Sequence, residues 1–206
     1  MIHNISNLFR QLNLIIKIYL NSFRNRGFPM SEEYFNSMYK EGKWKHRSEE
    51  RLERYTIIAG YCYYYKRGGS ILDVGCGEGV LLDFLDYGIF SKYIGIDISR
   101  SAFEEVKLDG KHNAQFIRAD IDTYVPNENF DIIVFIESIF YLKKPFDTLK
   151  HYEQFLRKDG FFIVSVYETH GSSLFWRKIK SLYRIVHEVK LVYRNISHKY
   201  AVLSPK

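Results

Sequence analysis

The sequence contains only two cysteines, Cys62 and Cys76, among 206 residues. Two cysteines are too few for the disulfide framework of a small secreted protein, so a reducing, cytoplasmic setting is the preferred interpretation. No cysteine and histidine cluster has the spacing of metal ligands, and we therefore expect no bound metal. A chain of 206 residues is long enough for one domain with a substantial hydrophobic core.

Acidic residues are missing from residues 1–28, and this segment also lacks a long apolar run. Apolar residues recur at helical spacing over residues 5–23, which predicts a basic amphipathic helix. Its longest apolar run is short and contains Lys17, which argues against a transmembrane span, and no cleavage site of a signal peptide follows. Three interpretations stay open: packing on its own domain, a homodimer contact, or peripheral membrane contact through residues 1–26.

The net charge of +6 is unevenly distributed along the chain. Residues 1–69 carry 12 basic and 6 acidic side chains, residues 70–169 carry 10 and 17, and residues 170–206 carry 8 and 1. Basic ends beside an acidic middle suggest an anionic acceptor, an anionic membrane surface or RNA. A basic, solvated surface without a specific partner is the alternative.

The most informative stretch is Ile71-Leu72-Asp73-Val74-Gly75-Cys76-Gly77-Glu78-Gly79. An apolar run ends in a glycine turn, and a helical pattern of apolar residues follows at once. Glycines at alternate positions let the backbone take positive φ and let a ligand approach the main chain. This is the pattern of a buried strand that leads into a helix at a nucleotide-binding crevice.

The spacing of the glycines argues against a dinucleotide. The dinucleotide fingerprint needs G-x-G-x-x-G and a pyrophosphate at the helix N-terminus, whereas this loop reads G-x-G-x-G. Glu78 lies at the start of the helix, where its carboxylate would repel a phosphate. The loop therefore predicts an adenosine ligand without phosphates.

Over residues 70–168 the chain resembles the class I S-adenosylmethionine-dependent methyltransferases of small-molecule type, whose first motif is similar to Asp-Val-Gly-Cys-Gly-Glu-Gly. The resemblance implies S-adenosyl-L-methionine as cofactor and an α/β, Rossmann-like, three-layer sandwich. Its sheet would have seven strands, mostly parallel, with one antiparallel strand near the C-terminus. The domain organisation would be an N-terminal helical cap over residues 1–69 and a methyltransferase core over residues 70–206, together one domain.

The hydrophobic pattern places the remaining elements of this fold. A helix is predicted to start at Ser31, and further helices at 48–65, 80–87, 99–109, 145–156 and 172–186. After the strand that ends at the glycine loop, strands are predicted at 92–97, 115–120, 130–137, 161–166, 188–194 and 199–203.

The resemblance assigns roles to side chains at the ends of successive strands. Asp97 lies 24 residues after Asp73, close to the spacing of a ribose-binding acid, although a helix N-cap is its other interpretation. Asp120 and Ile121 would meet the adenine, with Asp122 as a competitor, and Asp73 and the glycine loop would hold the methionyl end. The implied cofactor-binding set is Asp73, Gly75, Cys76, Gly77, Gly79, Asp97, Ile98, Asp120, Ile121 and Glu137.

Two residues are candidates for catalysis. Glu137 and His170 follow the fourth and fifth strands, where a base for a hydroxyl acceptor is expected. An amine acceptor needs no base beyond water, and a loop histidine is often merely exposed. Trp44, His46, Arg51, Arg54 and Tyr55 could help to build the acceptor pocket, and both arginines could instead pair with neighbouring glutamates.

The expected function is methyl transfer to an oxygen or nitrogen of a small-molecule acceptor, such as a sugar, a lipid-linked compound or a secondary metabolite. An RNA methyltransferase is the first alternative. The sequence has no recognisable RNA-binding module, and no Asn/Asp-Pro-Pro-Tyr motif follows the fourth strand. A nucleic acid partner is therefore disfavoured. The second alternative is a non-catalytic cofactor-binding partner subunit, because the glycine loop and Asp97 indicate binding and not turnover.

Overall fold

The computed structural model describes residues 25–44, 49–86, 90–104, 106, 110, 112–168, 172–193 and 196–206. The amphipathic helix predicted over residues 5–23 lies outside these ranges, and so do His46 and the candidate base His170. Within these ranges, no helix has both the length and the apolar character needed to cross a membrane.

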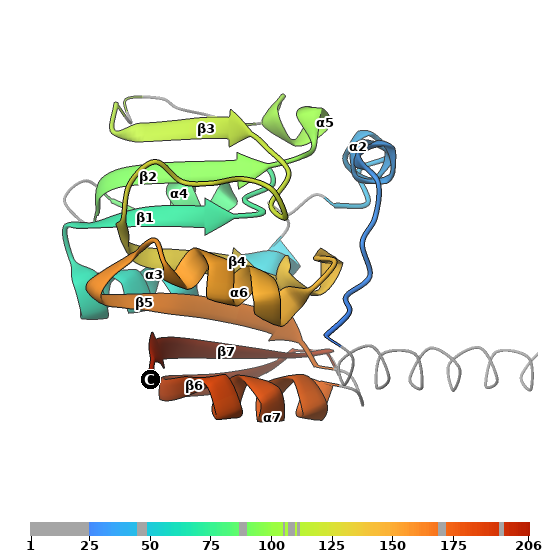
Figure 1. Cartoon of the computed structure of the whole chain (residues 1–206). Coiled ribbons are helices and arrows are strands. Elements are labelled where there is room, and N and C mark those ends of the chain that lie inside the picture. The colour runs from blue at the N-terminus through green and yellow to red at the C-terminus, as the bar shows by residue number, and fades with distance from the viewer. Residues whose placement is uncertain are drawn as a thin grey trace, which may run out of the picture.

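Seven strands form one sheet in the order β3-β2-β1-β4-β5-β7-β6 (Figure 1). They are β1 (Gly69–Val74), β2 (Phe90–Asp97), β3 (Ala114–Arg118), β4 (Phe130–Ile136), β5 (Leu156–Tyr167), β6 (Tyr183–Tyr193) and β7 (Ile196–Pro205). Strand β7 runs antiparallel to both neighbours, whereas the pairs among β1 to β5 are parallel. The predicted seven-stranded Rossmann-like sheet with one reversed strand is therefore confirmed.

Helices cover both faces of the sheet, as the apolar runs of its central strands require. One face packs against α6 (Pro145–Glu153) and α7 (Ser172–Leu182), and the other packs against α3 (Glu49–Lys66) and α4 (Val80–Asp83). Alternate residues of β4 enter the two cores, with Ile133 and Phe135 on the α6 side and Ile132 and Val134 on the α3 side. The result is three layers with the sheet in the middle.

Two helices that flank the site are shorter than the sequence pattern predicted. Helix α4 ends at Asp83 and not near residue 87, and α5 (Arg100–Phe103) ends well before residue 109. After the glycine loop, the amides of Leu82 and Phe84 bond to carbonyls three residues back, at 3.0 Å each. Such tight turns do not continue into a long α-helix, and periodicity alone does not distinguish them from one.

Boundaries near the C-terminus also differ from the prediction. Helix α7 ends at Leu182, and β6 begins at once because the β-branched Ile185 pairs with Leu203 of β7. Strand β5 begins at Leu156, five residues before the predicted start, and α6 accordingly ends at Glu153. The predicted Asp159–Gly160 turn is an irregularity within β5, where Phe130 pairs with Leu156 but Ile132 pairs with Phe161.

Helix α2 (Glu32–Lys40) lies beyond the carboxyl ends of β1, β2 and β3 (Figure 1). Ser31 is its N-cap and accepts a hydrogen bond from the Tyr34 amide. The segment before it is fixed to the core, because the Phe28 amide donates to the Phe140 carbonyl at 2.7 Å. A side chain at Gly27 would place its Cβ 2.0 Å from the Leu142 carbonyl oxygen, so only glycine lets the two segments approach this closely.

Candidate functional site

The glycine loop after β1 is held against the end of β2. The amides of Gly75 and Cys76 both donate to the Ile96 carbonyl, at 2.8 and 3.0 Å. Gly75 has φ +79°, and a Cβ on it would lie 2.5 Å from the Ser138 Cβ. Glycine is required here both by backbone conformation and by space.

Asp97 joins two loops at the end of β2. Its Oδ2 accepts a hydrogen bond from the Gly77 amide at 2.9 Å, and its Oδ1 accepts one from the Ser99 amide at 2.8 Å. Burial raises the pKa of Asp97, and the hydrogen bonds from backbone amides oppose that rise. Each carboxylate oxygen can accept a second hydrogen bond, so Asp97 can fix the glycine loop and still bind two hydroxyl groups.

The two aspartates in the loop after β3 differ in the hydrogen bonds that they accept from the protein. Asp122 is used by the fold, because its Oδ2 accepts from the Lys143 amide at 3.1 Å and its Oδ1 accepts from the Thr148 hydroxyl at 3.2 Å. Asp120 accepts only from the Asp122 amide through Oδ1, among the hydrogen bonds of the described residues. Asp120 therefore has the greater capacity for a ligand.

A cavity of about 530 Å³ opens at the carboxyl ends of the parallel strands. This volume is typical of a site for a small molecule or cofactor. Of the predicted site residues, it brings together Gly75, Asp97, Ile98, Asp120, Ile121 and Glu137. The rest of the lining comes mainly from the segment Pro29 to Trp44, from Arg54, from Ser138, Tyr141, Leu142 and Lys143, and from Tyr167.

Asp73, Cys76, Gly77 and Gly79 belong to the predicted set but do not line this cavity. Asp73 is 1 % exposed and lies within the core, where its Oδ2 accepts a hydrogen bond from the Tyr93 hydroxyl at 2.6 Å. Its other oxygen has no hydrogen-bond partner in the described part of the chain. Burial raises the pKa of Asp73 to about 7, against the opposing effect of the Tyr93 hydrogen bond.

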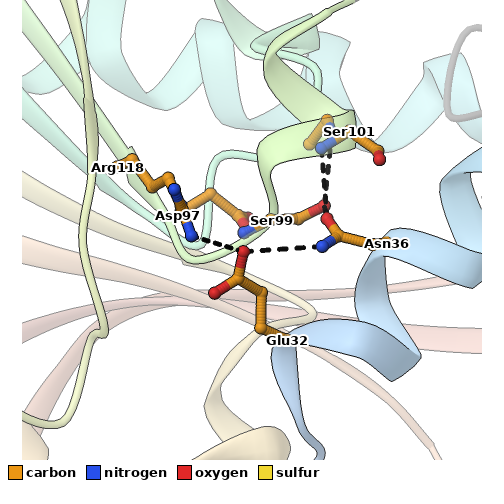
Figure 2. A network of polar contacts seen from close by, with 7 residues as sticks. Glu32, Asn36, Asp97, Ser99, Ser101 and Arg118 are labelled. Carbon is orange, nitrogen blue, oxygen red and sulfur yellow. Dashed lines mark hydrogen bonds and ion pairs between the residues drawn. The ribbon is translucent and has the colours of Figure 1, made fainter.

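Helix α2 is attached to the rim of the cavity by polar contacts (Figure 2). The Asn36 Oδ1 accepts hydrogen bonds from the Ser99 hydroxyl at 2.8 Å and from the Ser101 amide at 3.1 Å. Glu32 forms an ion pair with Arg118 of β3, with 2.6 Å between Oε1 and Nη2. These contacts join α2 to the segment that follows Asp97 and hold it over the strand ends.

Replacing Asn36 with alanine is expected to weaken S-adenosylhomocysteine binding by up to about 30-fold, because tenfold in affinity corresponds to about 1.4 kcal/mol. The substitution removes two hydrogen bonds that fix α2, each contributing about 1 kcal/mol, and leaves the residues beneath α2 unchanged. Calorimetric titration measures the affinity. Ser37→Ala is the matched control, because the Ser37 hydroxyl donates only to the Tyr34 carbonyl within the same helix. Equal affinities of the two variants would contradict a role for this attachment.

Arg54 is a functional candidate that the sequence left ambiguous. It lines the cavity from α3, and its guanidinium lies 6.0 Å from the centre of the Tyr55 ring. Of the glutamates expected to pair with it, Glu53 forms no ion pair with Arg54, and the side chains of Glu49 and Glu50 lie outside the described part of the chain. A cation in the cavity can hold a carboxylate.

Glu137 directly follows β4, and the structure surrounds its carboxylate with donors that the sequence did not indicate. From β5, the Ser165 hydroxyl donates to Oε1 at 3.0 Å and the Tyr167 amide donates to Oε2 at 2.6 Å. From β7, Nδ1 of His198 lies 3.0 Å from Oε1. The pairing of β7 with β5 brings His198 opposite Tyr167. Sequence reasoning missed His198, since only this long-range pairing places it near Glu137.

The cavity residues follow the order of the strands. Asp120 and Gly75 follow β3 and β1, and Asp97 is the last residue of β2, which lies between them. Glu137 and Tyr167 lie at the ends of β4 and β5 on the other side of β1. Within the described residues, no group of three or more potential metal ligands occurs. The donors fit an adenosyl cofactor in chemistry, since carboxylates can accept from ribose hydroxyls and an adenine amino group.

The model of the family described as "Methyltransferase domain" matches residues 44–190. Among curated proteins, malonyl-[acyl-carrier protein] O-methyltransferase 2 of Ilyobacter polytropus is 28% identical over 116 residues, 55% of this chain and 44% of that protein. The (S)-coclaurine N-methyltransferase of Papaver somniferum is 31% identical over 105 residues, 48% of this chain and 30% of that protein. The chain thus spans less than half the length of these relatives.

Solved structures share the fold at low sequence identity. N-methyltransferase NodS from Bradyrhizobium japonicum, in complex with S-adenosyl-L-homocysteine, gives a TM-score of 0.63 at 16% identity, covering 79% of this chain and 91% of NodS. Magnesium protoporphyrin IX methyltransferase from Synechocystis, with bound S-adenosylmethionine, gives a TM-score of 0.67 at 14% identity. This match covers 84% of the present chain and 94% of that structure. With the family match over most of the chain, these findings show that the protein belongs to the class I S-adenosylmethionine-dependent methyltransferases.

Proposed function

We propose that this protein transfers a methyl group from S-adenosylmethionine to the nitrogen of a small amine that carries an apolar ring. The observation that carries the proposal is the composition of the cavity lining. In it the Glu137 carboxylate occurs together with the aromatic rings of Phe35, Trp44, Tyr141 and Tyr167. Such rings bind apolar and cationic groups, and a carboxylate accepts an N–H hydrogen.

The aromatic lining is built around Trp44. Its ring centre lies 5.4 Å from that of Phe35, 5.6 Å from that of Tyr39 and 5.7 Å from that of Tyr141. Phe35 and Tyr141 also meet edge to face at 5.6 Å. This packing joins α2 and the loop after it to the segment that follows β4. A flat, apolar acceptor would fit against these rings better than a flexible polyhydroxylated one.

The charge of the lining favours a neutral or cationic acceptor. Five acidic residues contribute to it, Glu32, Asp97, Asp120, Asp122 and Glu137, against the two cations Arg54 and Lys143. An anionic acceptor, which the basic ends of the chain suggested, would meet repulsion in this negative lining. The relatives include both O- and N-methyltransferases, so the preference for nitrogen rests on the cavity.

The roles of the cofactor-binding residues follow from their chemistry. Asp97 would accept from the ribose hydroxyls, Asp120 from the adenine amino group, and Arg54 would hold the carboxylate of the methionyl part. When bound, S-adenosylmethionine supplies an electrophilic methyl carbon on a sulfonium, so that the acceptor nitrogen forms the new bond as the carbon–sulfur pair moves to sulfur. The protein contributes orientation and a site shielded from water.

Mass spectrometry of reactions with S-adenosylmethionine and matched acceptors tests this proposal. The panel pairs each ring-bearing amine with the alcohol and the carboxylic acid of the same skeleton. We expect amines to gain 14 mass units, about the mass of one added CH₂, with the oxygen compounds unchanged. Methylation of the alcohols or acids alone would overturn the choice of nitrogen. Tight S-adenosylhomocysteine binding without transfer to any acceptor would favour a non-catalytic partner subunit.

A further inference from the structure

Glu137 has an unusual backbone conformation for its residue type. Its φ is +55°, and in the described part of the chain Asn25 is the one other non-glycine residue with positive φ. A glutamate in this region is strained by about 1 kcal/mol, and such strain persists only where the surroundings fix it. Here the Glu137 amide donates to both the carbonyl and the hydroxyl oxygen of Ser165, at 3.2 Å each.

The carboxylate of Glu137 has one acceptor position left. A carboxylate has about four lone-pair positions, two on each oxygen. Oε1 accepts from the Ser165 hydroxyl and from His198 Nδ1, both at 3.0 Å, and Oε2 accepts from the Tyr167 amide at 2.6 Å. The second position of Oε2 receives no hydrogen bond from the described residues, and Glu137 lines the cavity.

His198 is fixed in the orientation that this contact needs. Its side chain is 15% exposed, and its ring lies 5.5 Å from the Tyr167 ring and 6.4 Å from the Tyr200 ring. Because an ionised carboxylate can only accept, the hydrogen of this contact belongs to Nδ1 of His198. A ring held by packing on two sides presents Nδ1–H to Glu137 at little entropic cost.

We propose that His198 is a positioning residue for methyl transfer. With Ser165 and the Tyr167 amide, it holds Glu137 so that one lone pair of Oε2 meets the N–H of the acceptor. This inference rests on the proposed function. As the nitrogen lone pair forms the bond to the methyl carbon and the carbon–sulfur pair moves to sulfur, the N–H proton passes to Glu137 Oε2 and from there to solvent.

Two substitutions at His198 separate this role from simple packing. His198→Asn places an amide N–H near the former Nδ1, whereas His198→Gln places it near the former Nε2. We expect kcat to fall about 10- to 100-fold in His198→Gln, the effect of losing a hydrogen bond to a charged group, and to recover most of this loss in His198→Asn. S-adenosylhomocysteine affinity and the KM for S-adenosylmethionine should stay within about twofold in both.

The matched control is His187→Gln, since His187 is an exposed histidine of β6 that lies against Tyr61. Wild-type turnover in His198→Gln would overturn the proposal, and so would equal loss in both His198 variants. A loss of S-adenosylhomocysteine affinity that parallels the loss of turnover would mean that His198 acts only in packing.

A measurement without acceptor keeps this inference separate from the proposed function. In protein with ¹⁵N-labelled histidine, we expect the His198 signal to show Nδ1–H, and Glu137→Gln to change that signal. Observation of the Nε2–H tautomer in the wild-type protein would overturn the inference even if an amine acceptor is found. Failure to methylate any amine, with the Nδ1–H signal present, would overturn the proposed function and leave the contact with Glu137 established.

Discussion

Replacing Asp97 with alanine is expected to weaken S-adenosylhomocysteine binding at least about 100-fold. Two hydrogen bonds from ribose hydroxyls to a carboxylate contribute about 1.5–3 kcal/mol each, and tenfold in affinity corresponds to about 1.4 kcal/mol. The substitution also leaves the amides of Gly77 and Ser99 without their acceptor. The glycine loop would then lose its connection to the end of β2, and both effects act in the same direction. Calorimetric titration measures the change.

Two further variants show which part of the Asp97 side chain matters. Asp97→Asn keeps one carbonyl acceptor and removes the charge, so we expect an intermediate affinity. Asp159→Ala is the control, because Asp159 is an exposed acid at the opposite end of β5. Unchanged affinity in Asp97→Ala would remove Asp97 from the cofactor site, and with it the strongest reason for expecting ribose in this cavity.

The central sheet and the glycine loop could be predicted because their signals are local. A continuous apolar run such as β4 and a loop with alternate glycines each follow from short-range physical constraints. Ends of helices are less well determined, because α4 and α5 stop through tight turns and capping contacts that the apolar period does not reveal. The start of β6 depends on pairing with β7, which is a tertiary contact.

The candidate site could be predicted only where a residue ends a parallel strand or follows it within a few positions. Asp97, Asp120 and Glu137 meet at one cavity because all parallel strands end at the same edge of the sheet. His198 could not be found in this way, because it comes from the reversed strand β7. Asp73 is a residue that the sequence wrongly placed in contact with the ligand. Its place in the motif suggested such a contact, but its side chain lies in the core.

The stability of the protein without cofactor is expected to fall as the pH rises from about 4 to about 7, because of Asp73. Burial raises the pKa of Asp73 from 3.8 to about 7. Between these values the folded chain keeps a proton on Asp73 that the unfolded chain has released. The resulting contribution to the free energy of unfolding is therefore fully present below pH 4 and is lost as the pH rises through 7. At 1.36 kcal/mol per pKa unit, the loss approaches about 4 kcal/mol.

Asp73→Asn isolates this effect, because the asparagine side chain stays neutral and can still accept from the Tyr93 hydroxyl. We expect urea unfolding between pH 4.5 and 8 to give a much flatter free-energy profile for this variant, and a greater stability than the wild type at pH 8. Some slope should remain, since burial also raises the pKa of Asp97. The same slope in variant and wild type would show that Asp73 is already ionised in the folded protein at pH 5. In that case its carboxylate would carry a charge in the core below the glycine loop, where a positively charged partner would be required to stabilise it.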